Sequence, residues 1–216
     1  HMSQELSKQS NGKFSIKVFN KSALGSEKET LDQVKIGALD MNRVNISSLN
    51  AICPKSLVPT MPFLFDSIAH MRKTLDGPIG EEILKGCESQ GLVGLAFYDS
   101  GARSIYAKKP VRNLADAKGL KIRVTENPVH ITAFKTLGAS PTPMSWPEVI
   151  GALQQGTIDG QENPMSVIVS AKLSQVQKYL SLTRHVYSPT LFLMAPKDWN
   201  ALSDADKKAF LGAAEA

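Results

Sequence analysis

Arg123 is the residue in this sequence best placed to hold a small ligand. It lies in the run 121–124, which reads as a short strand, and Asn127-Pro128 follows as a helix start. Ligands of open α/β sheets bind at the carboxyl ends of strands, where the next helix also directs backbone N–H groups toward anions. A guanidinium at that point can hold a carboxylate through two parallel hydrogen bonds. By position alone, an ion pair with a structural acid such as Glu126 is an equal alternative.

Three more side chains follow predicted strands or begin predicted helices. Arg103 comes after the apolar run 92–97 and Gly101, and it is either a ligand contact or a surface arginine. Asn163 ends the polar string 159–163 and could donate its amide to a ligand oxygen or cap the next helix. Trp146 opens a helix, where it would wall a pocket or pack in the core. These residues are candidates for one ligand site.

Catalytic and metal-binding signatures are missing from the sequence. It contains no GxSxG, HExxH, GxGxxG or phosphate-loop motif. His70, His130 and His185 stand alone, which favours capping or packing roles. Cys53 and Cys87 form no CxxC pair, and either one disulfide or two buried thiols would fit. We therefore expect no catalytic residue, no metal and no cofactor.

Composition narrows the possible partners. The chain has 216 residues and a formal net charge of +5, with its basic residues scattered among acids. Nucleic-acid binders concentrate basic charge on one element, so we expect none here, whereas a mild positive bias suits an anionic ligand. No apolar run approaches the roughly 18 residues of a membrane span. The start of the chain has no secretory signal, and His1-Met2 resembles a tag remnant.

The remaining pattern predicts alternating strands and helices. Capping-box spacing at Ser26 and Ser145 predicts helix starts, and Ser203 with Asp206 predicts a last helix. Alternation over 14–18 predicts a half-buried strand. Further strands are expected at 39–46, 92–97, 104–107, 121–124, 179–185 and 190–195, and further helices at 67–75, 79–90 and 128–137. This order is typical of an α/β fold.

An internal repeat suggests two related halves. Six positions recur at a constant offset of 119, namely Ser26, Glu29, Leu31, Val34, Gly37 and Asp40 with Ser145, Glu148, Ile150, Leu153, Gly156 and Asp159. We interpret them as a duplicated α/β unit with one copy in each lobe. The second copy follows a strand and a helix, whereas the first begins inside its helix, and the chain stops inside its last helix. We therefore expect material to be missing at both ends.

Five strings give the sequence a family resemblance. They are LGSE (24–27), GALDM (37–41), GLKIRV (119–124), GASPTPM (138–144) and DGQENP (159–164). In this order and spacing they resemble the substrate-binding proteins of tripartite ATP-independent periplasmic (TRAP) transporters, of the DctP type. The resemblance covers nearly the whole chain.

The resemblance implies a two-lobed, periplasmic-binding-protein-like α/β fold with a ligand cleft between the lobes. We expect residues 3–100 and 189–216 to form lobe 1 and residues 101–188 to form lobe 2. It also implies a periplasmic protein that captures a small organic carboxylate and delivers it to the membrane permease subunits, without catalysis. From the residues alone, an enzyme or a sensory domain acting on a carboxylate stays an alternative.

The resemblance also assigns roles to individual residues. Arg123 matches the family's carboxylate-binding arginine, while Arg103, Asn163 and Trp146 match positions that line the cleft. Glu162 of the DGQENP string and Asn45 complete the expected ligand-binding set. Asn45 stands where some members carry an acid, so the identity of the carboxylate stays open. From the resemblance, we expect the family's first strand and its C-terminal helices to lie outside this sequence.

Overall fold

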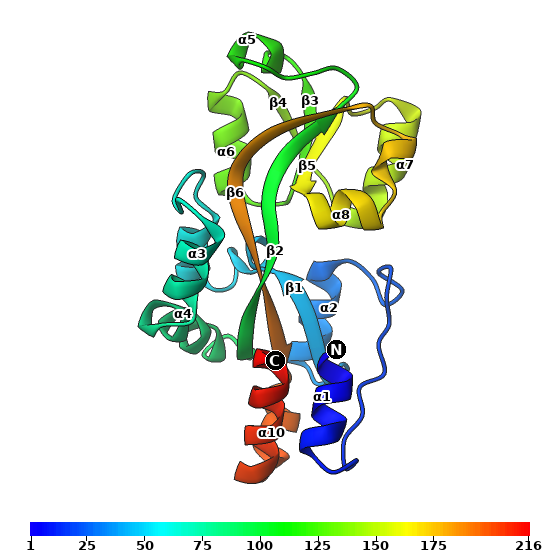
Figure 1. Cartoon of the computed structure of the whole chain (residues 1–216). Coiled ribbons are helices and arrows are strands. Elements are labelled where there is room, and N and C mark those ends of the chain that lie inside the picture. The colour runs from blue at the N-terminus through cyan, green and yellow to red at the C-terminus, as the bar shows by residue number, and fades with distance from the viewer. The chain divides into compact units, whose positions relative to one another are not determined.

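The computed structural model describes residues 1–216, which fold as alternating helices and strands (Figure 1). Contacts divide the chain into two compact units. The first unit comprises His1–Val44, Thr74–Tyr98 and Thr190–Ala216, and the second comprises Asn45–Lys73 and Asp99–Pro189. None of the helices combines the length and apolar character needed to cross a bilayer.

The first unit packs helices around three strand segments in the order β1-β6-β2. Its core is a cluster of apolar side chains that includes Leu6, Leu95, Met194 and Phe210. The unit contains α1 (Met2–Gln9), α2 (Glu27–Lys35), β1 (Met41–Asn45), α4 (Pro78–Glu88), the first part of β2 (Val93–Ala107), the last part of β6 (Tyr179–Met194), α9 (Pro196–Ala201) and α10 (Asp204–Glu215).

The predicted strand at 14–18 is wrong. The segment has no regular secondary structure and pairs with no strand. Instead, Ser3 Oγ donates to the Ile16 carbonyl at 3.2 Å and accepts from the Ile16 N–H at 3.3 Å. Phe14 packs edge-on against Phe210 with ring centroids 5.1 Å apart. Phe14 and Ile16 therefore lie on the side of the segment that faces α1 and α10, and their alternation does not indicate a strand of the sheet.

The second unit holds the larger part of the sheet, in the order β6-β2-β5-β3-β4. Strand β3 runs parallel to both β4 and β5, while β2 and β5 are antiparallel. Its elements are η1 (Ile46–Leu49), η2 (Pro54–Thr60), α3 (Ile68–Leu75, which ends in the first unit), α5 (Leu114–Ala117), β3 (Lys121–Val124), α6 (Pro128–Thr136), β4 (Ser140–Pro143), η3 (Trp146–Glu148), α7 (Val149–Gln155), β5 (Gly160–Pro164), α8 (Met165–Ser170) and η4 (Leu173–Gln175).

The helix starts and stops lie where the sequence placed them. Ser26 and Ser145 both form capping boxes, although the first turn after Ser145 is the 3₁₀ helix η3. Gly37 and Gly156 both adopt left-handed backbone, with φ near 70°, at the ends of α2 and α7. The two copies of the repeat thus fold as helix, glycine stop and strand, one in each unit.

Residues 45–73 group with the second unit, not with the lobe that the sequence suggested. A buried polar cluster near the start of α6 contributes to this grouping. With its amide oriented to satisfy its neighbours, Asn50 accepts from Asn127 Nδ2 at 2.5 Å and donates to Ser56 Oγ at 2.8 Å. Buried polar groups require such partners, so this cluster ties η1 and η2 to α6. The lobe boundaries as a functional division stay a prediction.

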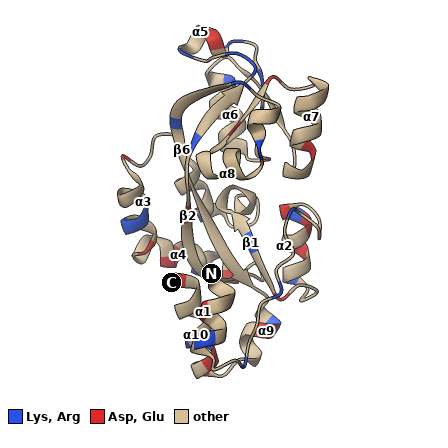
Figure 2. Cartoon of the chain, turned by 45° about the vertical axis from the view of Figure 1, so that its right-hand side comes forward, with Lys and Arg blue, Asp and Glu red and all other residues tan.

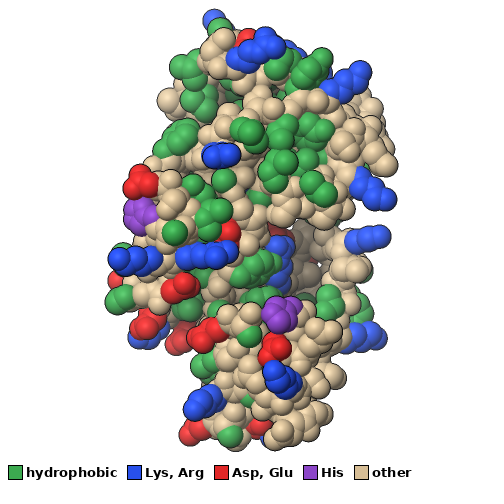
Figure 3. All heavy atoms as spheres, viewed as in Figure 1, with side chains coloured by type: hydrophobic (Ala, Val, Ile, Leu, Met, Phe, Trp, Pro, Cys, Tyr) green, Lys and Arg blue, Asp and Glu red, His purple; other side chains and the backbone are tan.

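Both cysteines are disulfide-bonded, so neither Cys53 nor Cys87 is free. The charged residues are spread over many helices and strands of both units (Figure 2). On the face seen in Figure 3, apolar, basic and acidic side chains are intermixed. The basic residues on this face form no continuous patch of the kind that a nucleic acid would require.

Candidate functional site

Arg123 is buried in β3, with 4% of its surface exposed. Its Nε and Nη2 both donate to the Met144 carbonyl, at 2.9 and 2.6 Å. The guanidinium carbon lies 5.8 Å from the centre of the Trp146 ring, which is within cation–π range. The segment after β4 therefore fixes the guanidinium from two sides, by a backbone carbonyl and an aromatic ring.

The N-terminus of α6 is less open to an anion than the sequence suggested. Asn127 is fully buried, and its Oδ1 accepts from Val129 N at 2.8 Å and from His130 N at 3.1 Å. These two N–H groups are among the four that a helix start leaves without an intrahelical partner. The capping side chain already occupies them, so they do not supplement Arg123.

Strand register separates the candidate residues onto two faces of the sheet. Arg123 lies opposite Gln161, and Asn163 lies opposite Ser104. Because side chains alternate along a strand, Gln161 and Asn163 share the face of Arg123. Glu162 points to the other face, as does Arg103. The sequence could not predict this division, because it depends on which residues pair.

Arg103 and Glu162 form a buried ion pair. Arg103 lies inside β2 rather than at a strand end, and is 2% exposed, whereas Glu162 is fully buried. The Arg103 Nε donates to Glu162 Oε2, and its Nη2 donates to Oε1 at 2.7 Å and to the Glu162 carbonyl at 2.6 Å. This is the bidentate geometry in which arginine pairs most strongly with a carboxylate. The partner here is a side chain of the same chain.

Two histidines extend this buried group. His185 Nε2 lies 3.2 Å from Glu162 Oε2, and its Nδ1 lies 2.8 Å from Thr183 Oγ1. His130 Nδ1 lies 2.8 Å from Thr125 Oγ1, and its Nε2 has no hydrogen-bond partner. The sequence treated both histidines as isolated. Nothing in their local sequence indicates the pairing of His185 with Glu162.

The electrostatics keep Glu162 ionised and His130 neutral. Burial alone raises the pKa of Glu162. The Arg103 charge and the hydrogen bonds from His185 and Arg103 lower the pKa by more than burial raises it, so the pKa lies well below its usual range. Burial lowers the pKa of His130 from 6.5 to about 4, with the Arg103 and His185 charges acting in the same direction and Glu162 opposing them. Near neutral pH the cluster therefore holds a carboxylate beside a guanidinium.

Asn45 is part of the hydrogen-bond network of Arg103. Its Nδ2 donates to Ser188 Oγ at 2.5 Å, and its Oδ1 accepts from the Ser47 N–H and hydroxyl. Ser188 also accepts from Arg103 Nη1 at 3.3 Å. The structure therefore separates the six predicted residues. Arg123 contacts Trp146, and Asn163 shares its face of the sheet. Arg103, Glu162 and Asn45 belong to a second, hydrogen-bonded group, with Ser188 and His185 as members that the sequence did not reveal.

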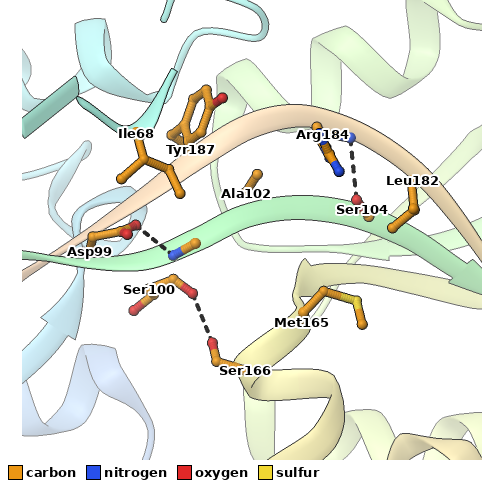
Figure 4. A pocket seen from close by; sticks show the side chains of 11 residues that line it. Ile68, Asp99, Ser100, Ala102, Ser104, Met165, Ser166, Leu182, Arg184 and Tyr187 are labelled. Carbon is orange, nitrogen blue, oxygen red and sulfur yellow. Dashed lines mark hydrogen bonds between the residues drawn. The ribbon is translucent and has the colours of Figure 1, made fainter. Parts of the chain in front are cut away.

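A cavity of about 560 Å³ lies beside β2, β6 and α8 within the second unit (Figure 4). Asp99 accepts from the Gly101 N–H at 2.6 Å, and Ser104 Oγ accepts from the Arg184 N–H at 3.2 Å. Arg123, Asn163 and Arg103 do not line this cavity. No group of three or more His, Cys, Asp or Glu side chains is arranged to hold a metal ion.

Comparison with known proteins decides the family. The sequence model described as bacterial extracellular solute-binding protein, family 7 (DctP), matches residues 1–216. The chain belongs to this family. Proteins of the family are extracytoplasmic solute-binding proteins of TRAP transporters, which confirms the resemblance carried by the five strings. The α/β fold class is confirmed by the same comparison.

Individual relatives agree in sequence and in fold. A solute-binding protein of Verminephrobacter eiseniae is 45% identical over 212 residues, covering 98% of this chain and 63% of the relative. The chain thus spans less than two thirds of that protein's length. A TRAP periplasmic solute binding protein from Bordetella bronchispeptica, with density assigned to pantoate, superposes with a TM-score of 0.97 at 48% identity, covering 99% of this chain and 71% of the other. One from Polaromonas sp. JS666, bound to D-erythronate, gives 0.96 at 44% identity, with coverages of 99% and 71%.

Proposed function

We propose that this chain captures a small organic carboxylate, with Arg123 as the residue that binds the carboxylate group. The observation that carries the proposal is the fixed, buried guanidinium of Arg123 between the Met144 carbonyl and the Trp146 ring. Holding the guanidinium in place before the ligand arrives lowers the entropy cost of binding. The acids bound by the two similar structures, pantoate and D-erythronate, support a carboxylate ligand.

Arg103 and Glu162 have a different part in this proposal. Because Glu162 already holds Arg103 through two parallel hydrogen bonds, and both side chains point to the face of the sheet opposite Arg123, the pair stabilises the strands that carry the site rather than supplying a second carboxylate clamp. Arg103 Nη1 also donates to Ser188 Oγ. Asn45 extends this network through Ser188. Asn163 and Trp146 lie on the side of Arg123 and contact the ligand.

The proposal is capture without chemistry. Glu162, the carboxylate nearest to a histidine in the cluster, is fully buried and paired, so it is a poor general base. The chain would act in the periplasm and pass its ligand to the membrane permease subunits of a TRAP transporter, as the family membership suggests. An enzyme or a sensory domain would use the same carboxylate site but would need features that the sequence and the contacts above do not supply.

A thermal-shift screen tests the proposal. Ligand at 100 times its dissociation constant stabilises the folded state by about 2.7 kcal/mol, which raises the melting temperature of a chain of this size by about 5–10 °C. We expect hydroxy acids and sugar acids to produce this shift, and the matching neutral sugars and amines to produce none. The bound acid should be recovered chemically unchanged after long incubation. Stabilisation by neutral sugars or amines alone would overturn the carboxylate assignment, and conversion of the acid would overturn capture without chemistry.

A further inference from the structure

The end of the second unit that carries α5 concentrates positive charge. Residues 107–121, from the end of β2 to the start of β3, contain five basic residues and one acid, a net charge of +4 in a chain whose total is +5. The basic residues are Lys108, Lys109, Arg112, Lys118 and Lys121. Over the rest of the chain, basic and acidic residues nearly balance, so the overall composition does not reveal this concentration.

The fold brings the two ends of this segment to one edge of the sheet. The end of β2 lies beside the start of β3, because Ala107 and Ile122 both pair with Gly160 of β5. At the same edge, Lys108 forms an ion pair with Asp159. Helix α5 lies in the connection between the two strands, with basic residues before and after it (Figures 1 and 2). The positive charge is therefore gathered around α5.

Three of these cations lack an acidic partner. Lys109, Arg112 and Lys118 are exposed, and none of them forms an ion pair. Asp116, the one acid of the segment, directs its Oδ2 to the backbone N–H of Arg112 at 2.8 Å. It therefore bonds to the backbone of the connection and does not pair with a basic side chain. The three cations are available to an anionic partner.

An exposed apolar side chain stands among the cations. Leu114, the first residue of α5, is 66% exposed, whereas Val111 nearby packs against the apolar core of the unit. A single exposed leucine is ordinary, but here it is flanked by basic residues on both sides. Segments that lie on anionic bilayers combine basic residues with apolar side chains that enter the headgroup boundary. The segment has no aromatic residue between 107 and 121 on which a nucleic-acid base could stack.

We propose that the α5 surface, formed by Lys109, Arg112, Leu114 and Lys118, binds the anionic phospholipid headgroups of a membrane, and that Leu114 enters the boundary between headgroups and acyl chains. Each basic residue close to such a surface strengthens binding about fivefold. A contact of this kind is reversible, so it raises the concentration of the chain at the membrane without anchoring it. The inference goes beyond carboxylate capture and uses no residue of the proposed ligand site.

Co-sedimentation with lipid vesicles tests the inference. The probes are vesicles of phosphatidylglycerol and phosphatidylcholine in equal parts, and vesicles of phosphatidylcholine alone. At an ionic strength of about 0.01 M, we expect the unaltered chain to bind only the anionic vesicles, and at about 0.15 M at least fivefold more weakly, because salt screens the attraction. Lys109→Ala and Arg112→Ala should each weaken binding about fivefold, and Leu114→Ala at least threefold.

Two variants of α2 and its C-cap are matched controls. Lys28 is an exposed lysine, and Ile36 is 79% exposed, more than Leu114. Lys28→Ala and Ile36→Ala should each change vesicle binding less than twofold. Absence of binding to the anionic vesicles at low ionic strength, or equal losses in the α5 and α2 variants, would overturn the inference. All these variants should keep the thermal shift with organic acids. If the acids give no shift while vesicle binding follows the α5 surface, the proposed function fails and this inference stands.

Discussion

The Arg103–Glu162 pair gives the sharpest prediction about stability. Replacing Glu162 with alanine would leave the guanidinium of Arg103 buried at 2% exposure without its counter-charge. Removing one partner of a buried pair costs about 3–5 kcal/mol, mostly because the remaining charge is uncompensated. His185 would lose its contact with Glu162 in the same variant. We therefore expect Glu162→Ala to lower the free energy of unfolding by about 4 kcal/mol.

The assay is urea unfolding at pH 7, where Glu162 is ionised because its pKa is lowered. The double variant Arg103→Met with Glu162→Leu removes both charges and should lose much less unfolding free energy than the sum of the losses of Arg103→Met and Glu162→Leu made singly. Glu81→Ala is the matched control, because the Glu81–Lys85 pair in α4 is 3.6 Å long and 68% and 72% exposed. It should cause no measurable change. A loss below about 1 kcal/mol for Glu162→Ala, or full additivity in the double variant, would refute the reasoning.

Two further predictions concern pH and helix geometry. The pKa of His130 is about 4 in the folded state and 6.5 in the unfolded state. Between these pH values the unfolded state binds more protons than the folded state. The free energy of unfolding should therefore fall by up to about 3 kcal/mol as the pH drops from 6.5 toward 4. Denaturant titrations at several pH values should show a smaller decline for His130→Gln, and an equal decline would refute the assignment. Gly156→Ala should destabilise by about 1 kcal/mol because φ is +71°, whereas Gly151→Ala in the same helix has open space and should stabilise by up to about 1 kcal/mol. Thermal melts of the two variants check this, and equal effects would contradict it.

Local signals predicted the helix boundaries well. The capping boxes at Ser26 and Ser145 and the glycine stops at Gly37 and Gly156 are all present, because each depends only on residues within one or two turns. The segment 14–18 shows the limit of such signals. Alternation marks one buried face, but a strand also requires a partner, and here the side chain of Ser3 takes that place.

The sequence named the candidate residues, whose role in ligand binding stays a prediction, but it did not indicate their arrangement. The strings GLKIRV and DGQENP contain Arg123 and Glu162 but do not show that the two side chains point to opposite faces of the sheet. Which of the candidates pair depends on strand register, and Arg103 and Glu162 are 59 positions apart in the sequence. An ion pair between residues so far apart in the sequence produces no periodic pattern from which it could be predicted. For the same reason, the contacts of His185 with Glu162 and of Gln161 with Asn163 emerged only from the structure.

The central claim is that Arg123 binds the carboxylate of the ligand. Its most direct test is calorimetry of D-erythronate, or of the acid that gives the largest thermal shift, with Arg123→Ala and Lys121→Ala. Lys121 is an exposed residue of the same strand with the same charge, so it controls for long-range electrostatics. Hydrogen bonds to charged groups contribute roughly 1.5–3 kcal/mol, so Arg123→Ala should weaken binding at least tenfold, and Lys121→Ala should weaken it less than twofold. Unchanged affinity of a folded Arg123→Ala variant, or equal losses in the two variants, would contradict the claim.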